Sequence, residues 1–194
     1  MGGGRAAADA RFGQVVLGPA GELLPESPAG SVSTDRLRLY CGIDFESCLP
    51  TCMMANQIAI HIRCRPGDVF LTEAEAHVVT SESGAASARS GAMPRLVAAV
   101  HGAFDLTDLA AALRLGDAQR AGAALVLQEN THVRSGGRVV AFEHMEAVAE
   151  IARAQGVPVH LDGARIFNAA TALGRPASDL AELAETVSFN LNKG

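Results

Sequence analysis

The sequence predicts an α/β fold, in which a mostly parallel sheet is covered by helices on both faces. Short apolar runs of strand type alternate with segments of helical periodicity through the second half of the chain. Polar clusters follow three of these runs, around residues 129–132, 162–165 and 192–193. The chain has 194 residues, of which 48% are apolar, so it can bury one sizeable core. Because ligands bind beyond the strand ends of open α/β sheets, we expect these clusters to share one site.

The composition argues against several classes of protein. A net charge of −5 and a pI near 5.6 give no electrostatic footprint for nucleic acid. No apolar run approaches the length of a transmembrane helix, and the first residues lack the apolar core of a secretory signal. The four cysteines contain no C-x-x-C pair, so we expect reduced, mostly buried thiols and no metal site. We therefore expect a cytoplasmic protein that contacts neither nucleic acid nor a membrane.

Residues 1–47 are expected to form an irregular N-terminal segment. Residues 1 to about 36 are rich in glycine, alanine, proline and serine, and they show little periodicity. The short segments at residues 15–17 (Val-Val-Leu) and 22–24 (Glu-Leu-Leu) are expected to be too short to form much structure. A strand is predicted at residues 38–43.

The first predicted helix follows a loop at residues 49–53 and runs from about residue 53 to residue 62. Ala55, Ile58, Ala59 and Ile62 recur at helical spacing and are expected on its buried face. A turn with proline and glycine at residues 65–68 ends this helix. The later predicted elements, in chain order, are a strand at 69–72, a helical turn at 84–88, a strand at 93–97, a helix at 105–113 capped by Asp105, a strand at 123–128, a helix at 142–155 followed by a capping Gly156, a strand at 158–162 leading into a helical run, and a strand that begins at residue 186.

Three residues near the last two strand ends have a joint chemical meaning. The amine of Lys193 could form an imine with a carbonyl cofactor. In pyridoxal phosphate enzymes an acid such as Asp162 commonly pairs with the pyridinium nitrogen, which makes the ring an electron sink. The guanidinium of Arg165 is a planar fork that suits a substrate carboxylate. The alternative is a buried aspartate that caps a helix, together with a surface arginine and a surface lysine.

Several motifs occur together in one order along the chain. The strongest are at residues 129–132 (Glu-Asn-Thr-His), 160–170 and 188–194, and weaker ones lie at residues 54–59, 65–68, 76–77 and 82–86. Over roughly residues 48–194 the sequence resembles the low-specificity L-threonine aldolases, in the β-eliminating-lyase branch of fold-type I pyridoxal-phosphate enzymes. The resemblance implies that residues 48–194 form part of the cofactor-binding large domain of that fold, without the small C-terminal domain.

The resemblance also implies a reaction and a role for each matching residue. The family cleaves L-threonine and L-allo-threonine to glycine and acetaldehyde, using pyridoxal 5′-phosphate, and its members are dimers or tetramers. Either of two histidines, or a water, would act as the base. The implied roles are Lys193 as the covalent cofactor ligand, Asp162 on the pyridine nitrogen, His77 stacked on the ring, Arg165 on the substrate carboxylate, His132 near the substrate hydroxyl, and Thr51, Cys52 and Met53 at the phosphate. Glu82 is expected either as a hydrogen-bond partner within this site or as a solvated carboxylate.

The sequence departs from the family's pattern in three places. Cys52 and Met53 stand where the family has a glycine and a hydroxyl residue, so we expect weaker phosphate binding. Residues 1–47 look unlike the family. The chain ends one residue after Lys193, so we expect apolar surface at Val187, Phe189 and Leu191, poor solubility or oligomerisation, and little aldolase turnover. Two alternatives therefore stay open, namely another pyridoxal-phosphate-dependent β-eliminating lyase and a catalytically inactive fragment of a threonine aldolase.

Overall fold

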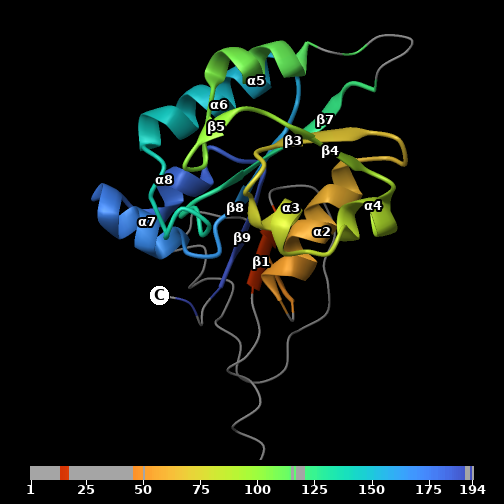
Figure 1. The fold of residues 1–194 in the computed structure, drawn as a ribbon. Helices are drawn as coiled ribbons and strands as arrows, with labels where there is room; N and C mark the ends of the chain where they lie inside the picture. Colours follow the sequence, from red (N-terminus) through yellow and green to blue (C-terminus); the bar gives the residue numbers. More distant parts are fainter. Residues whose placement is uncertain are drawn as a thin grey trace, which may run out of the picture.

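The fold is built on a seven-stranded mixed sheet (Figure 1). The computed structural model describes residues 14–17, 46–49, 51–114, 116, 121–190 and 193. Five neighbouring strands run parallel, and the N-terminal strand joins them in the antiparallel sense. The strand order across the sheet is β2 (Glu46–Cys48), β1 (Gln14–Leu17), β9 (Thr186–Phe189), β8 (Val159–Asp162), β7 (Ala123–Glu129), β3 (Val69–Thr72) and β4 (Met93–Leu96). A separate two-stranded ribbon consists of β5 (Ala99–Val100) and β6 (Ala103–Phe104).

Helices cover both faces of the sheet, as the sequence predicts (Figure 1). One face carries α2 (Cys52–Arg63), α3 (His77–Thr80) and α4 (Ala85–Ser90). The opposite face carries α5 (Leu106–Leu113), α6 (Phe142–Ala154), α7 (Ile166–Leu173) and α8 (Ala177–Ala181). The predicted fold class is therefore confirmed.

Alternate side chains of each central strand belong to different cores. Phe70 and Leu127 pack with Ile60 of α2, whereas Leu71 and Val126 pack with the α5 and α6 side. Both sides of these strands are therefore buried, which explains why they are continuous apolar runs in the sequence. Strand β8 differs, because only its residues on the α7 side are apolar, and its α2 side carries His160 and Asp162.

Helix α2 differs from its prediction in the face that it buries. Thr51 caps the helix by accepting a hydrogen bond from the Met54 N–H at 3.0 Å. Ala55 and Ala59 are buried as expected, but Ile62 is 53% exposed, and the expectation for that residue is wrong. The buried face is turned toward Asn56 and Ile60 instead, because Asn56 finds polar partners on the strands beneath it.

The predicted ends of two other helices are confirmed. Asp105 caps α5 by accepting hydrogen bonds from the N–H groups of Thr107 and Asp108. Gly156 follows α6 with a φ of 67°, a conformation that glycine adopts without a steric penalty. Its N–H donates to the Arg153 carbonyl, which closes the helix.

The N-terminal strand overturns an expectation about the apolar surface near the end of the chain. Residues 15–17 are not too short to form structure, because Gln14–Leu17 forms β1 and pairs with β9. Val187 and Phe189 are only 3% and 1% exposed, because β9 lies inside the sheet and packs against α7 and α8. The expectation that these two side chains form an exposed surface is therefore wrong. The predictions for residues 22–24, for Leu191 and for a strand at residues 38–43 lie outside the described residues.

Two further expectations concern the thiols and membranes. Cys52 and Cys64 are free and buried, in agreement with the prediction for them. The side chains of Cys41 and Cys48 lie outside the described part of the chain. Among the residues that the structure describes, no helix has both the length and the apolar character needed to cross a bilayer.

Candidate active site

Asp162 lies at the carboxyl end of β8, where the parallel strands of the sheet end together. Its side chain is buried, with 3% of the residue exposed. One carboxylate oxygen accepts a hydrogen bond from the Asn56 amide at 2.7 Å, and the other accepts one from the Ala164 N–H at 3.2 Å. The second bond supports the turn before α7. Asp162 is therefore buried and also stabilises the turn that leads into α7.

Asn56 makes four hydrogen bonds beneath this edge of the sheet and is fully buried. Its Nδ2 donates to Asp162 Oδ2 at 2.7 Å and to Glu82 Oε1 at 2.9 Å. Its Oδ1 accepts from His160 Nε2 at 3.0 Å and from Ser188 Oγ at 2.8 Å. We call these five residues, Asn56, Glu82, His160, Asp162 and Ser188, the Asn56 cluster. The sequence did not indicate a role for Asn56, although a polar residue at an apolar-face position of a helix was a usable signal.

His160 is the neutral member of the Asn56 cluster. Burial lowers its pKa to about 4, against an attraction from Asp162 that acts in the opposite direction. Its Nε2–H donates to Asn56, because the oxygen there can only accept. The hydroxyl of Thr186 then donates to His160 Nδ1 at 2.8 Å. His160 therefore links strands β8 and β9 without carrying a charge.

Glu82 holds His77 in place. Glu82 is 1% exposed and also accepts hydrogen bonds from Asn56 and Gln57, so the prediction of a hydrogen-bond partner is confirmed and the solvated alternative is wrong. His77 Nδ1 donates to Glu82 Oε1 at 2.8 Å, while the His77 side chain stays 31% exposed. The hydrogen bond to Glu82 raises the pKa of His77, although partial burial opposes this. The imidazole is thus anchored on one side and open on the other.

Glu129 connects the loops that follow β3 and β7. One carboxylate oxygen accepts the His77 N–H and the other accepts the Val133 N–H, each at 2.8 Å. Burial raises the pKa of Glu129, and the charge of Asp162 adds to this effect. Glu129 therefore fixes the backbone from which the His77 side chain extends.

His132 lies deeper than His77 and is 2% exposed. Its Nε2 faces Glu73 Oε1 at 2.9 Å, and its Nδ1 faces Ser135 Oγ at 2.8 Å. A Cβ atom on Gly102 would lie 2.7 Å from the His132 ring, so the ring packs directly against the Gly102 backbone. Both ring nitrogens of His132 are therefore engaged, and the sequence did not indicate the partners Glu73 and Ser135.

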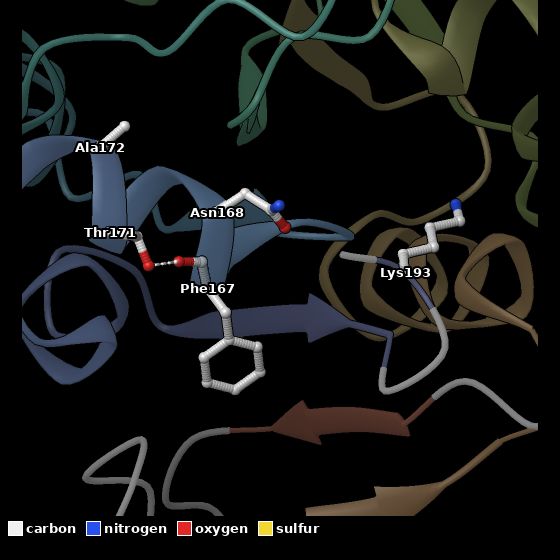
Figure 2. Close-up of a pocket in the computed structure, with 5 residues that line it drawn as sticks. All are labelled: Phe167, Asn168, Thr171, Ala172 and Lys193. Carbon is white, nitrogen blue, oxygen red and sulfur yellow. Dashed lines mark hydrogen bonds between the residues drawn. The ribbon is translucent and has the colours of Figure 1, made fainter.

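Lys193 is half-buried beyond the end of β9 and is the only lysine in the sequence. It lines an open depression of about 390 Å³ together with four residues of α7, namely Phe167, Asn168, Thr171 and Ala172. Figure 2 shows the lysine side chain extending away from these α7 residues. Burial and Asp162 raise the pKa of the Cys52 thiol to about 12, and the charge of Lys193 partly offsets the rise. Lys193 and Asp162 are thus both close enough to Cys52 to act on its thiol.

The remaining predicted site residues lie at two helix starts. Thr51 is the N-cap of α2, Cys52 is the first residue of the helix, and Met53 is 39% exposed. Arg165 is half-buried and directly precedes α7. Both helices start at the carboxyl ends of β8 and β9, although α2 and α7 cover opposite faces of the sheet.

Three of these side chains could in principle ligate a metal ion. Ligand atoms of His77, Glu82 and Asp162 lie within 4.8 Å of one another. The Asn56 amide already donates to Glu82 Oε1 and to Asp162 Oδ2. The two carboxylates are therefore bridged by an amide donor.

The chain belongs to the β-eliminating lyase family, whose sequence model matches residues 23–194. It is 38% identical over 151 residues to the low-specificity L-threonine aldolase 1 of Arabidopsis thaliana, covering 75% of this chain and 42% of that protein. It is 31% identical over 147 residues to the low specificity L-threonine aldolase of Escherichia coli K12, covering 75% of this chain and 43% of that protein. The chain thus spans less than half the length of these relatives, and the predicted resemblance is confirmed.

Solved structures share the fold. A protein from Listeria monocytogenes EGD-E matches with a TM-score of 0.72 at 24% identity, covering 82% of this chain and 43% of that chain. The threonine aldolase of Leishmania major matches with a TM-score of 0.63 at 23% identity, covering 70% and 40% of the two chains. At these identities the matches support the fold and not a particular reaction.

Proposed function

We propose that the chain is the cofactor-binding part of a pyridoxal-phosphate-dependent lyase that cleaves L-threonine and L-allo-threonine to glycine and acetaldehyde. The observation that carries the proposal is the buried Asp162 carboxylate, with His77 held beside it through Glu82 and Lys193 beyond the neighbouring strand. The reaction in this proposal is inferred from the threonine aldolases among the relatives of the chain.

The residues present fit pyridoxal phosphate. A carboxylate has about four acceptor positions, and Asp162 uses one on each oxygen. Asp162 can therefore accept a further hydrogen bond from a pyridine N–H. Because Asp162 is buried, a positively charged partner would offset the cost of burying its charge. The exposed side of the His77 imidazole is available to stack on the cofactor ring, and Lys193 supplies the amine that binds the cofactor. When bound, the cofactor supplies the electron sink that allows the bond between Cα and Cβ to break.

The helix start at Thr51 is the proposed phosphate site. The Thr51 oxygen accepts the Met54 N–H, which leaves its hydroxyl hydrogen free to donate. The N–H groups of Cys52 and Met53 lie in the first turn of α2, where they have no partner within the helix. Helix N-termini of this kind bind anions. Arg165 is proposed to bind the substrate carboxylate through its planar fork.

The two histidines are proposed to have different roles. The raised pKa of His77 extends the pH range over which it is protonated, which suits a ring contact and a hydrogen-bond donor. In the tautomer whose Nε2–H donates to Glu73, His132 Nδ1 is the nitrogen able to accept a proton, and it lies beside Ser135 Oγ, whose own hydrogen bonds the His132 carbonyl at 3.2 Å. The only side chain bonded to that nitrogen among the described residues is the half-buried Ser135. We propose that a proton from the substrate hydroxyl reaches His132 by way of Ser135 or a water beside it.

The single lysine makes the central assignment directly testable. The purified chain is mixed with pyridoxal phosphate, reduced with borohydride and mapped by peptide mass spectrometry. We expect the adduct on Lys193, and we expect Lys193→Arg to leave only the N-terminal amine able to react. A folded chain whose only label is at the N-terminus would contradict the proposal.

The reaction type needs a separate assay. Release of acetaldehyde from L-threonine and L-allo-threonine is compared with elimination from serine and from a β-substituted cysteine. Preferential cleavage of the two threonines supports the aldolase proposal. Preferential elimination would favour the alternative of another β-eliminating lyase, and binding without any turnover would favour an inactive relative.

A further inference from the structure

Every donor and acceptor of the Asn56 side chain is hydrogen-bonded to a residue of the Asn56 cluster. An asparagine side chain offers two donor hydrogens and two acceptor lone pairs. The two hydrogens go to Asp162 and Glu82, and the oxygen accepts from His160 and Ser188. Because Asn56 is fully buried, water does not substitute for any of these bonds.

The surroundings allow the Asn56 amide only one orientation. His160 is uncharged over the usual pH range, because burial lowers its pKa to about 4. Its one N–H and the Ser188 hydroxyl both point at Asn56 Oδ1. A rotated amide would set its NH2 group against these two donors and its oxygen against two carboxylates. His160 and Ser188 therefore direct the NH2 group toward Asp162 and Glu82.

The two carboxylates that share this amide have different contacts. Asp162 ends β8 and supports the turn before α7. Glu82 lies before α4, where it holds the His77 imidazole and accepts from Gln57 at 2.6 Å. The Asn56 amide is thus the direct link between the acid at the strand end and the acid that carries the imidazole.

We propose that Asn56 is a positioning residue that fixes the Asp162 carboxylate and, through Glu82, the His77 imidazole relative to each other. The inference rests on the proposed function, in which these two groups contact the cofactor, whereas Asn56 acts only through the carboxylates. Without its amide, two buried carboxylates would lose their shared donor and repel each other. One of them would then rotate or take up a proton, and His77 or the pyridine nitrogen would lose its partner.

The first test uses the unsubstituted chain without cofactor, so it does not depend on the proposed function. Exchange of the side-chain amide protons of Asn56 with solvent is measured by NMR and compared with the exposed Asn168. We expect exchange at Asn56 to be slower by about ten-fold or more, because both hydrogens are bonded and buried. Exchange as fast as at Asn168 would overturn the proposal.

The second test compares two substitutions within the Asn56 cluster. Asn56→Ser removes both amide donors, whereas Ser188→Ala removes one donor to Oδ1 and leaves both carboxylate bonds in place. In Asn56→Ser we expect altered His77 ring-nitrogen shifts, a shifted pH titration of the bound cofactor's absorbance, and about ten-fold or greater loss of cofactor affinity. In Ser188→Ala, where His160 still orients the amide and both carboxylate bonds remain, we expect clearly smaller changes in all three quantities.

Each outcome separates the positioning role from a purely structural one. A folded Asn56→Ser chain with unchanged His77 shifts and cofactor affinity overturns the proposal, and so does an equal effect in Ser188→Ala. If the unsubstituted chain forms no adduct at Lys193, the proposed function fails, but the exchange rates and the His77 shifts still decide the role of Asn56. If Asn56→Ser does not fold, the exchange measurement decides it alone.

Discussion

Two histidines bonded to the same cluster of side chains have pKa values shifted in opposite directions. His160 has no exposed surface and bonds only neutral groups, so burial dominates and lowers its pKa. His77 donates to the Glu82 carboxylate, so the hydrogen bond dominates and raises its pKa. Asn56 lies between the two histidines, because its oxygen accepts from His160 and its NH2 group donates to Glu82, the partner of His77. The direction of each pKa shift follows from burial at His160 and from the Glu82 carboxylate at His77.

We predict that His160 makes the folded chain less stable in acid. Its pKa is about 4 when folded and near 6.5 when exposed, so the unfolded chain binds an extra proton between these values. The stability is full above about pH 6.5 and is lost as the pH falls toward 4, on the order of 3 kcal/mol in total. Urea unfolding at pH 7 and pH 4.5 measures it. The His160→Gln variant should lose this part of the pH dependence, and an unchanged slope would refute the assignment.

The charge of Glu82 has a separate consequence for His77. A raised folded-state pKa contributes stability that is present below the unfolded pKa and is lost as the pH rises through the folded pKa. We predict that Glu82→Gln lowers the pKa of His77, while Gln57 rotates its amide to accept from the new NH2 group. NMR titration of the His77 ring is the measurement, with Glu73→Gln as the control, because Glu73 pairs with His132 instead. An unaltered His77 titration in Glu82→Gln would show that the Glu82 hydrogen bond does not raise the pKa of His77.

At the scale of elements, α2 combines the proposed phosphate site and the Asn56 cluster in one helix. Thr51, Cys52 and Met53 form its start, and Asn56 follows one turn later. Changes in the first turn should alter cofactor binding, whereas the Asn56 bonds to Asp162 and Glu82 are made one turn later.

We predict that the combined variant Cys52→Gly and Met53→Thr binds pyridoxal phosphate more tightly. Glycine removes the buried side chain next to the proposed phosphate, and threonine adds a hydroxyl donor worth roughly 1.5–3 kcal/mol to a charged acceptor. Glycine in a helix should cost about 1 kcal/mol of stability. Fluorescence or absorbance titration gives the affinity, and Met54→Thr is the control, since the Met54 N–H is already bonded to Thr51. Equal affinity in the combined variant and the original chain would show that the start of α2 does not bind the phosphate.

The sequence predicts most helices and strands because their periodicity and caps are local properties. The caps at Asp105 and Gly156 are examples, and each matches the structure. The failures involve partners that are distant in sequence. Ile62 is expected inside because no pattern reveals that Asn56 is satisfied by Asp162, 106 residues later. Likewise, the sequence indicates Glu82 as a possible hydrogen-bond partner but not that it holds His77, and Glu73, which pairs with His132, became evident only from the three-dimensional contacts.

At the scale of the whole molecule, β4 is an edge strand of the sheet that pairs in parallel with β3, and it carries exposed apolar side chains. Met93 is 52% exposed and Leu96 is 54% exposed, and Val100 of the neighbouring ribbon is 71% exposed. Exposed edge strands with apolar residues favour association with another chain. The predicted homo-oligomer therefore has a candidate contact at β4, in place of the surface on β9 that the structure shows to be buried.

We predict that the purified chain self-associates and that Leu96→Lys weakens this association. Analytical ultracentrifugation or gel filtration over a range of concentrations measures the effect. Ile62→Lys is the control, because Ile62 is equally exposed but lies on α2, away from this edge. A chain that is monomeric at every concentration, or equal effects of the two lysines, would exclude β4 as the contact.

The pairing of β1 with β9 has a consequence for how the protein is made. Val16 pairs with Val187, about 170 residues later in the sequence. Ribosomes add roughly 5–20 residues per second, so β1 leaves the exit tunnel about 10–30 seconds before its central partner exists. Its pairing with β2 can form early, but its place beside β9 is available only after β9 has been made. The first of the described strands to be made is thus among the last to take its place in the sheet, and a chaperone that shelters it during synthesis would act on that step.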